Sequence, residues 1–196
     1  MRIAKVLGIA GSPRRNGNTE FLLREFLRGA ETSGLETELI ILCKLNLSPC
    51  TSCDSCQKDG ICVIRDDMQM MYKKLTEARF IVFASPIYFC GVSAQLKAFI
   101  DRCQSLWSKK YILRQPILGP EKVRRKGFFI STAGTPGNKK VFAGAIATVK
   151  AIFHVLEIEY TGELLYPGME KKDAILTHPT EMQEAYSLGL SLGKDQ

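Results

Sequence analysis

Short apolar runs alternate with amphipathic segments along most of the chain. Apolar residues recur at helical spacing over 19–33, where Phe21, Leu22, Phe26 and Ala30 share one helix face. The same periodicity predicts helices over 67–78, 95–106, 140–156 and 180–192. Continuous apolar runs predict five strands, near 5–11, 36–43, 79–85, 127–134 and 157–165.

Strands that are apolar on both faces and separated by helices indicate a parallel sheet covered on both sides. The pattern predicts one doubly wound α/β domain over residues 1–196, with the five strands in the order 2-1-3-4-5. Two irregular insertions interrupt it, residues 44–66 and 106–125. Ligands of such sheets bind beyond the carboxyl ends of the strands, so the loops after the first, third and fourth strands form the candidate site.

Composition narrows the class of protein. Hydrophobic residues make up 45% and charged residues 24% of the chain, which is typical of a globular domain and argues against disorder. No apolar run reaches the ~18 residues of a membrane helix, and the first residues lead directly into a strand pattern, so we expect a cytoplasmic protein. Seven cysteines, an odd number, disfavour a closed disulfide framework and favour metal or redox chemistry.

The net charge of +7 is concentrated in one stretch. Between residues 106 and 126 a single acid, Glu121, stands against seven basic residues: Lys109, Lys110, Arg114, Lys122, Arg124, Arg125 and Lys126. Such a stretch is typical of a solvated loop, but it also suits an anionic cofactor or an acidic protein partner. Nucleic acid is the weakest interpretation, because no helix-turn-helix or RNA-recognition signature accompanies the charge.

The loop after the first predicted strand has the composition of an anion site. It runs Gly-Ser-Pro-Arg-Arg-Asn-Gly-Asn-Thr over residues 11–19 and leads into a helix, whose first N–H groups attract an anion. Asn18-Thr19 stands where a Walker loop needs Lys-Ser/Thr, and the glycine spacing does not match the dinucleotide fingerprint. A phosphomonoester fits better; the alternative is a tight turn in which Asn18 or Thr19 only caps the helix.

The loops after the third and fourth strands suit a flat ring. Pro86 ends the third strand sharply, and Tyr88 and Phe89 follow it. The fourth strand ends in Ser-Thr-Ala-Gly-Thr-Pro-Gly (131–137), whose small side chains let a planar ligand approach the backbone. A phosphate cradle combined with two ring-binding loops describes a site for flavin mononucleotide (FMN).

The segments GSPRRNGNT, SPIYFCGVSAQLKAFIDR and STAGTPGN resemble those of the flavodoxin-like NAD(P)H-dependent FMN reductase superfamily. The resemblance extends over nearly the whole chain and implies a flavodoxin-like fold. Carried over by position, it implies that the FMN phosphate is held by Ser12, Arg14, Asn18 and Thr19, and the isoalloxazine ring by Pro86, Ile87, Tyr88, Phe89 and the Ala133–Gly134 backbone. Cys90 departs from the pattern, since relatives usually have a glycine or another small residue there. We expect Cys90 to be a small buried side chain rather than a reactive thiol.

A cysteine-rich insertion after the second strand is the strongest single signal. Its spacing is C-x2-C-x2-C-x5-C, formed by Cys50, Cys53, Cys56 and Cys62. Three cysteines at successive short intervals are typical of a loop around one corner of a cubane cluster, so the spacing predicts a [4Fe–4S] cluster completed by Cys62. Structural zinc, which usually uses two separated pairs, and metal-free thiols with a labile disulfide are the alternatives. We expect Cys43 and Cys103 to be buried small residues.

An FMN-binding domain with this insertion resembles the iron–sulfur flavoproteins of anaerobic archaea and bacteria. The resemblance implies one [4Fe–4S] cluster and one FMN per subunit, and association into homodimers or homotetramers. It also implies electron transfer from ferredoxin, or a similar acidic donor, to an unidentified acceptor. The basic stretch is a candidate docking site for that donor; alternatively its charge is solvated, or offsets the anionic cofactors.

Two functions from other classes remain open. An NAD(P)H-dependent FMN, quinone, azo or nitro reductase would use the same flavin and bypass the cluster. A zinc- or thiol-based sensing module would catalyse no reaction. His154 and His178 lie outside the three loops, and no catalytic triad or carboxylate pair is evident, so we assign no catalytic side chain and expect the chemistry to belong to the cofactors.

Overall fold

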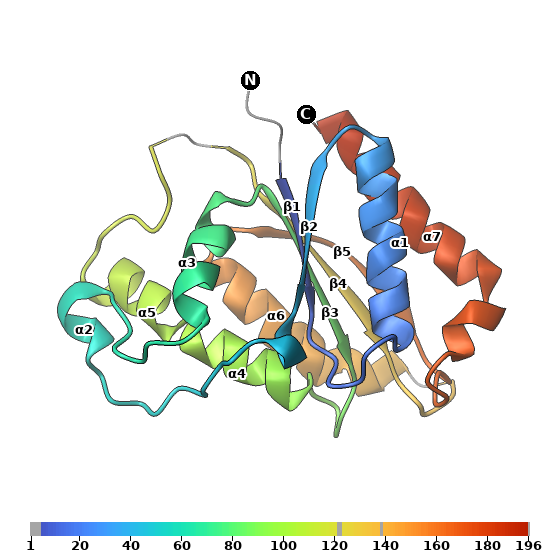
Figure 1. The fold of residues 1–196 in the computed structure, drawn as a ribbon, viewed down its shortest axis with the longest axis horizontal. Helices are drawn as coiled ribbons and strands as arrows, with labels where there is room; N and C mark the ends of the chain where they lie inside the picture. Colours follow the sequence, from blue (N-terminus) through green and yellow to red (C-terminus); the bar gives the residue numbers. More distant parts are fainter. Residues whose placement is uncertain (1–4, 121–122, 138, 196) are drawn as a thin grey trace.

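A five-stranded sheet forms the centre of the fold in the computed structural model, which describes residues 5–120, 123–137 and 139–195 (Figure 1). The strand order is β2-β1-β3-β4-β5, and every neighbouring pair is parallel. The strands are β1 (Lys5–Ala10), β2 (Glu36–Ile41), β3 (Phe80–Pro86), β4 (Lys126–Thr132) and β5 (Glu159–Tyr166). This confirms the predicted doubly wound, flavodoxin-like architecture.

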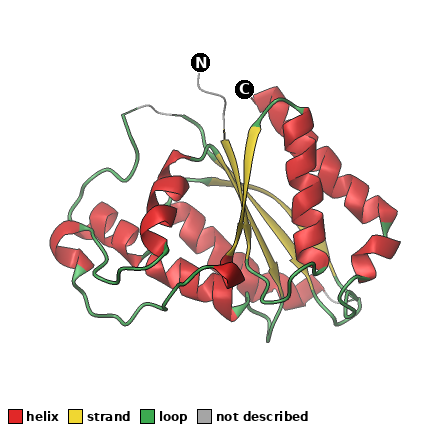
Figure 2. Cartoon of the chain, viewed as in Figure 1, coloured by secondary structure: helices red, strands yellow, loops and turns green. Residues whose placement is uncertain are grey.

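Helices cover both faces of the sheet (Figure 2). They are α1 (Asn18–Thr32), α2 (Cys56–Asp59), α3 (Met68–Glu77), α4 (Ala94–Arg102), α5 (Gln104–Trp107), α6 (Ala143–Val155) and α7 (Pro179–Ser191). Helices α1 and α7 share one hydrophobic core with the sheet, whereas α3, α4 and α6 share the other. The predicted helices are therefore all present, with ends shifted by a few residues.

The central strand β3 shows why its sequence is a continuous apolar run. Phe80, Val82 and Ala84 belong to the core under α1 and α7, and Ile81 and Phe83 belong to the opposite core. All five side chains are fully buried. Because successive side chains of a strand point to opposite faces, a strand buried on both sides needs apolar residues at every position.

Two glycines allow α1 and α7 to pack closely. A Cβ atom on Gly29 would lie 2.0 Å from the carbonyl oxygen of Tyr186, and one on Gly189 would lie 1.9 Å from that of Phe26. Any side chain at either position would force the helices apart. Helices α1 and α7 therefore cover one face of the sheet as a closely packed pair whose backbones are in contact.

The two irregular insertions lie side by side. Residues 44–66 leave the sheet as a long loop that contains α2, and the 108–112 turn of the second insertion packs against it (Figure 1). The contact is close, because a Cβ atom on Gly60 would lie 3.0 Å from the Cβ of Lys109. Glu121 and Lys122 of the basic stretch lie outside the described residues.

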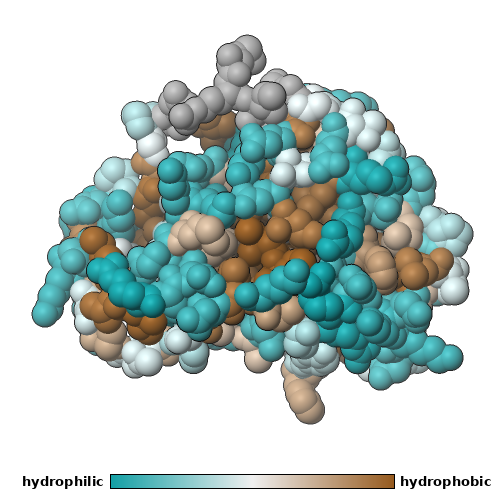
Figure 3. Space-filling model, viewed as in Figure 1, coloured by the Kyte–Doolittle hydropathy of each residue, from teal (hydrophilic) through white to brown (hydrophobic). Residues whose placement is uncertain are grey.

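The surface in Figure 3 is largely hydrophilic, with an apolar area at the centre of this face over the edge strand β2. Leu39 and Ile41 of β2 are partly buried and pack against the core of α1 and α7. In the part of the chain that the structure describes, no helix is long and apolar enough to span a membrane.

Candidate functional site

A cavity of about 280 Å³ lies at the carboxyl edge of the sheet. It is lined by Ser12, Arg14, Gly17, Asn18, Thr19, Pro86, Ile87, Tyr88, Thr132, Gly134, Thr135, Met169 and Glu170. Eight of the ten residues predicted for FMN are in this set; Phe89 and Ala133 are not. The loops after β1, β3 and β4 therefore meet where the topology requires, and the loop after β5 joins them.

The loop after β1 is shaped by local hydrogen bonds that leave Arg14 facing the cavity. The hydroxyl of Ser12 accepts from the N–H of Arg14 at 3.0 Å and donates to its carbonyl at 3.1 Å. Arg15 turns the other way and pairs with the buried Glu20. Gly17 is the N-cap of α1, and no side chain caps it. The alternative in which Asn18 or Thr19 serves as the cap is therefore wrong.

Asn18 has a structural role that its sequence context did not reveal. Its amide nitrogen donates to the carbonyls of Met169 at 3.1 Å and Lys171 at 2.7 Å. Its amide oxygen accepts from the N–H of Ile175 at 3.2 Å. The side chain thus connects the start of α1 to the loop after β5. An anion at this position would therefore be bound by the backbone N–H groups at the start of α1 and not by the Asn18 side chain.

The loop after β3 makes a two-residue turn at Phe89 and Cys90. Tyr88 and Gly91 exchange backbone hydrogen bonds of 3.0 and 2.9 Å, and the φ angles of Phe89 and Cys90 are 49° and 62°. This left-handed turn carries both side chains away from the core, so Phe89 and Cys90 are exposed. The prediction that Cys90 is buried is therefore wrong.

The loop after β4 is tied to the loop after β5. Ala133 donates its N–H to the carbonyl of Tyr166 at 3.1 Å and accepts from the N–H of Met169 at 2.8 Å. Its backbone is thus engaged within the protein, and Gly134 is the residue that faces the cavity. A Cβ on Gly134 would lie only 1.8 Å from Oε2 of Glu170. Met169 and Glu170 were missed, although a fifth parallel strand must also end at this edge.

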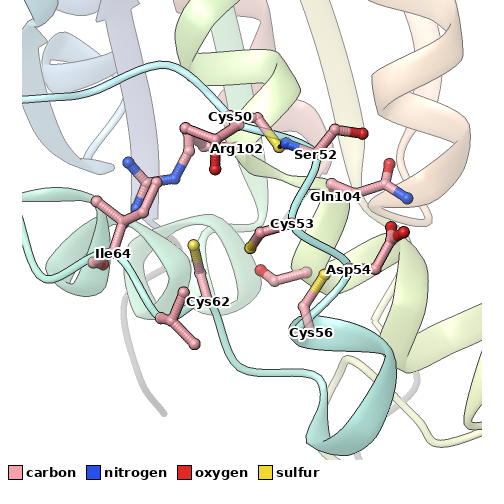
Figure 4. A pocket seen from close by; sticks show the side chains of 12 residues that line it. Cys50, Ser52, Cys53, Asp54, Cys56, Cys62, Ile64, Arg102 and Gln104 are labelled. Atoms are coloured by element: carbon pink, nitrogen blue, oxygen red, sulfur yellow. Dashed lines mark hydrogen bonds between the residues drawn. The ribbon is translucent and has the colours of Figure 1, made fainter.

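A second cavity, of about 60 Å³, brings the four predicted cysteines together (Figure 4). Its lining is Cys50, Thr51, Ser52, Cys53, Asp54, Cys56, Cys62, Val63, Ile64, Arg102, Gln104 and Ser105. All seven cysteines lie within the described residues and none forms a disulfide. Within those residues, no group of three or more His, Cys, Asp or Glu side chains is arranged to hold a single metal ion.

Hydrogen bonds affect two of the thiols that line this cysteine cavity. Hydrogen bonds from Ser55 hold the pKa of Cys53 below its usual value, which favours the thiolate that metals bind. The sulfur of Cys56 lies 3.4 Å from the hydroxyl oxygen of Ser108. Four thiols line this cavity and no histidine does, and such soft donors suit iron–sulfur clusters and zinc.

Cys43 and Cys103, both expected to be buried, differ in their exposure to solvent. Cys103, the C-cap of α4, is buried, as predicted, and burial raises its pKa to about 12. Cys43 is exposed, so its predicted burial is wrong. It belongs to the short 3₁₀ turn that ends β2, where Leu42 rather than Cys43 faces the core.

Arg102, at the end of α4, holds both ends of the cysteine loop and was not anticipated. Its guanidinium pairs with Asp66 at 2.6 Å and donates to the carbonyl of Ser48 at 2.8 Å. Burial raises the pKa of Asp66, but hydrogen bonds from Arg102 and from backbone N–H groups outweigh burial and hold that pKa below its usual value. The one available signal was an arginine among the buried positions Leu96, Phe99 and Cys103 of an amphipathic helix.

Helix α4 connects the two cavities. At its start, the hydroxyl of Ser93 accepts from the N–H of Leu96 and donates to the carbonyl of Gly11, beside the loop after β1. At its end, Arg102 lines the cysteine cavity. Nine residues separate the two, which is about 13 Å along a helix axis.

Arg125, Arg124 and Lys110 of the basic stretch have partners within the protein. Arg125 is buried, donates to the carbonyls of Leu75, Ala78 and Leu156, and has its pKa lowered by burial to about 10. Arg124 pairs with Glu159 at 2.7 Å, and Lys110 pairs with Glu157 at 3.3 Å. The stretch is therefore not a uniformly solvated loop, and Arg125 cannot contact a partner protein.

Comparison with known proteins bears on both cavities. A family model for NADPH-dependent FMN reductase matches residues 4–158. An iron–sulfur flavoprotein of Methanocaldococcus jannaschii is 49% identical over 102 residues, which cover 52% of this chain and 53% of that protein. One of Archaeoglobus fulgidus is 46% identical over 106 residues, 54% of each chain. The chain thus spans about half the length of these curated relatives, and they confirm the resemblance to iron–sulfur flavoproteins.

A solved structure extends the likeness to almost the entire fold. An FMN-dependent NADH-azoreductase from Bacillus anthracis, in complex with FMN, superposes with a TM-score of 0.68. The superposition covers 97% of this chain and 100% of that one, at 15% sequence identity. The fold is therefore shared where the sequence has diverged.

Proposed function

The chain belongs to the NADPH-dependent FMN reductase family, and from this premise we propose that it is a redox flavoprotein with two cofactors. FMN occupies the cavity at the carboxyl edge of the sheet, and one [4Fe–4S] cluster occupies the cysteine cavity. The protein transfers electrons from a ferredoxin, or a similar acidic donor, to a second acceptor. The observation that carries this proposal is that all four predicted cysteines line one cavity, connected by a single helix to a flavin-type cavity.

The residues of the first cavity fit FMN. Arg14 and the first N–H groups of α1 provide a positive, donor-rich end for the phosphate. Ile87 and Tyr88 provide an apolar wall, and Gly134, which has no side chain, lines the cavity together with Glu170. Bound FMN would supply one- and two-electron redox chemistry, whereas the chain's own residues orient the ring and exclude water from one side of it.

The C-x2-C-x2-C-x5-C spacing and the shared cavity of the four cysteines support a cluster in the second cavity. Zinc bonds its thiolates at about 2.3 Å, which requires the four sulfurs to lie within roughly 4 Å of one another. In this part of the chain four cysteines surround one space. A cubane spreads its four ligands over its corners and so suits a wider arrangement. A bound cluster would supply one-electron transfer.

Helix α4 supports a connection between the two redox sites. Ser93 anchors its start beside the proposed phosphate loop, and Arg102 anchors its end in the cysteine loop. Since a helix is rigid over this length, the separation of the sites is set by the fold rather than by a flexible linker. A fixed short separation is what electron transfer within one chain requires.

The donor and the oligomeric state are part of the proposal. Lys109 packs beside Gly60 of the cysteine loop, and Arg114 nearby is exposed. These charges suit an acidic protein that docks near the cluster. Phe89, fully exposed at its turn, suits burial between subunits of a homodimer or homotetramer. We place this protein in the cytoplasm, where ferredoxins act.

Anaerobic purification followed by a visible spectrum and by iron, sulfide and flavin analysis tests the proposal. We expect one FMN, with about four iron and four sulfide ions, per chain. Zinc in place of iron, with no flavin absorbance, would instead establish the sensing module. Iron and sulfide without flavin would contradict the assignment of the first cavity.

An NAD(P)H-dependent FMN, quinone, azo or nitro reductase is the second candidate, and the description of the matching family favours it. Such an enzyme oxidises pyridine nucleotide without ferredoxin and without the cluster. Rapid NADPH oxidation by the purified protein, undiminished in Cys53→Ala, would support this candidate over ferredoxin-dependent transfer. Negligible NADPH oxidation combined with reduction by ferredoxin would reject it.

A further inference from the structure

Arg102 has one hydrogen-bond donor that the protein leaves unused. Its guanidinium carries five N–H groups. Nη1 donates to the carbonyl of Ser48 at 2.8 Å and to Oδ2 of Asp66 at 2.6 Å. Nη2 donates to the carbonyl of Ile64 at 3.3 Å and to Oδ1 of Asp66 at 3.0 Å. The fifth donor, Nε–H, is buried and has no hydrogen-bond partner among the residues that the structure describes.

The residue that carries the unused donor forms part of the wall of the cysteine cavity. The side chain of Arg102 has no exposed surface, and the residue lines the cavity together with the four cysteines. Figure 4 shows Arg102 and Cys62 on the same side of the space that the cysteines surround. A buried donor without an acceptor destabilises a protein, and such groups in native structures usually have a partner that completes them. The acceptor expected here is the group that fills the cavity.

We propose that Nε–H of Arg102 donates a hydrogen bond to a sulfur atom of the bound cluster, either a bridging sulfide or the thiolate of a cysteine ligand. This inference rests on the proposed function, because it needs a cluster in the cysteine cavity. Asp66 and the two carbonyls fix the guanidinium through its other four donors, so Nε–H has a defined position. Arg102 therefore acts as a tuning residue and not as a ligand.

The hydrogen bond has a consequence for the cluster's reduction potential. Reduction adds one electron, and hence one negative charge, to the cluster and its thiolates. A hydrogen bond from a cationic group stabilises the reduced form more than the oxidised form, and hydrogen bonds to the sulfurs are among the features that set cluster potentials. Arg102 is expected to raise the potential of the cluster and to leave that of the flavin unchanged.

The unaltered protein provides the first test. We would grow it with ¹⁵N-arginine, reduce the anaerobically purified protein with dithionite, and record pulsed EPR spectra of the reduced cluster. Among the described residues that line the cavity, Arg102 is the only arginine, so the inference requires a ¹⁵N coupling from a single arginine nitrogen. A full complement of iron and sulfide without that coupling overturns the inference. Absence of iron and sulfide overturns the proposed function instead.

The variant Arg102→Lys provides the second test. Lysine keeps a positive charge to pair with Asp66 but has a carbon atom at the position of Nε. We expect loss of the ¹⁵N coupling and a cluster potential more negative than that of the unaltered protein, with the flavin potential unchanged. An unchanged cluster potential at full iron content overturns the inference.

Two matched variants distinguish an effect on the cluster potential from an effect on the folding of the protein. Asp66→Asn weakens the ion pair and keeps Nε–H, so the ¹⁵N coupling is expected to persist. Arg28→Lys makes the same exchange on the exposed surface of α1 and is expected to leave the cluster potential unchanged. Should Arg102→Lys fail to fold, the labelling experiment on the unaltered protein decides the question by itself.

Discussion

The hydroxyl of Ser93 donates a 2.5 Å hydrogen bond to the carbonyl of Gly11, and this contact joins the start of α4 to the end of β1. Gly11 lies so close to the helix that a Cβ atom there would be 2.7 Å from Cβ of Leu96. The loop proposed to hold the FMN phosphate is therefore positioned by the helix whose other end holds the cysteine loop.

Ser93→Ala removes both the helix cap and this buried hydrogen bond. We expect the free energy of unfolding to fall by about 1–3 kcal/mol, because an N-cap contributes about 1 kcal/mol and the Gly11 carbonyl loses its donor. Urea titration followed by circular dichroism measures the change. Ser191→Ala is the matched control, since that exposed hydroxyl bonds only to Leu188 of its own helix; an equal loss in both variants would refute the role of Ser93.

Arg14→Ala should weaken the binding of FMN but not of riboflavin, which lacks the phosphate. A hydrogen bond to a charged group contributes about 1.5–3 kcal/mol, so the Kd for FMN should rise roughly 10- to 150-fold. Fluorescence titration of the apoprotein with each flavin measures both constants. Arg28→Ala, an exposed residue of α1 that pairs with Glu25, should change neither. Equal weakening of both flavins by Arg14→Ala would place the phosphate elsewhere.

Cys53→Ala should remove most of the cluster iron and leave FMN bound. Cys53 lines the cysteine cavity, and three remaining thiolates hold a four-iron cluster poorly. Iron, sulfide and flavin analysis of the variant provides the measurement. Cys43→Ala is the matched control, because Cys43 is exposed and does not line that cavity. Unchanged iron in Cys53→Ala, or equal loss in both variants, would reject the ligand assignment.

Glu20 should make the protein sensitive to acid. Burial raises its pKa, but hydrogen bonds from Arg15, Arg24 and the N–H of Asn16 outweigh burial and hold the pKa below the usual value. A carboxylate whose pKa is lower in the folded state stabilises the fold fully above its unfolded pKa of about 4.3, and that contribution is lost as pH falls through the folded pKa. Glu20→Gln should therefore be less stable than the unaltered protein at pH 7.

The pH profile of this difference provides the check. Urea unfolding of both proteins between pH 7 and pH 3 should show the stability gap narrowing as the solution becomes acidic. Glu77→Gln, on the exposed surface of α3, should follow the unaltered protein throughout. A gap between Glu20→Gln and the unaltered protein that stays constant over this range would contradict the argument.

Docking of an acidic donor should depend on Lys109 and Arg114. Changing both to glutamate should slow reduction by ferredoxin but not by a small neutral reductant. Raising the salt concentration from 0.1 M to 1 M should slow the ferredoxin reaction of the unaltered protein, since the Debye length falls from ~10 Å to ~3 Å. Each of Lys109→Glu and Arg114→Glu alone should also slow this reaction. Arg124→Glu, just before the amino-terminal end of β4, is the control of equal charge change for each single variant. Insensitivity of the rate to salt and to both substitutions would exclude this surface.

The central strands were predictable because burial on both faces leaves a continuous apolar run. Phe80 to Ala84 shows this pattern without interruption, and its helical neighbours have clear periodicity. The strand order followed from the arrangement common in doubly wound sheets. The phosphate loop and the four cysteines were predictable because each is a local spacing of distinctive residue types. Such signals do not depend on how distant segments pack.

The wrong predictions concern residues whose conformation or burial is determined by tertiary contacts. The turn at Phe89 and Cys90 adopts left-handed angles without a glycine, so nothing in the sequence marks it. Arg125 lies in a run of basic residues, yet three carbonyls from distant segments bury it. The role of Arg102 depends on Ser48 and Asp66, which are far away in sequence, and local pattern carries no information about such pairing.

The hydrogen bonds of Arg102 to both ends of the cysteine loop also affect what happens to the protein when a bound cluster is lost. In a zinc finger the metal organises the chain, so loss of the metal unfolds it. Here protein contacts of Arg102 anchor the loop at Ser48 and Asp66. We therefore expect oxygen damage to empty the site without dismantling it. We expect fresh iron and sulfide to rebuild a cluster in the intact loop, so that the cell need not degrade the damaged protein.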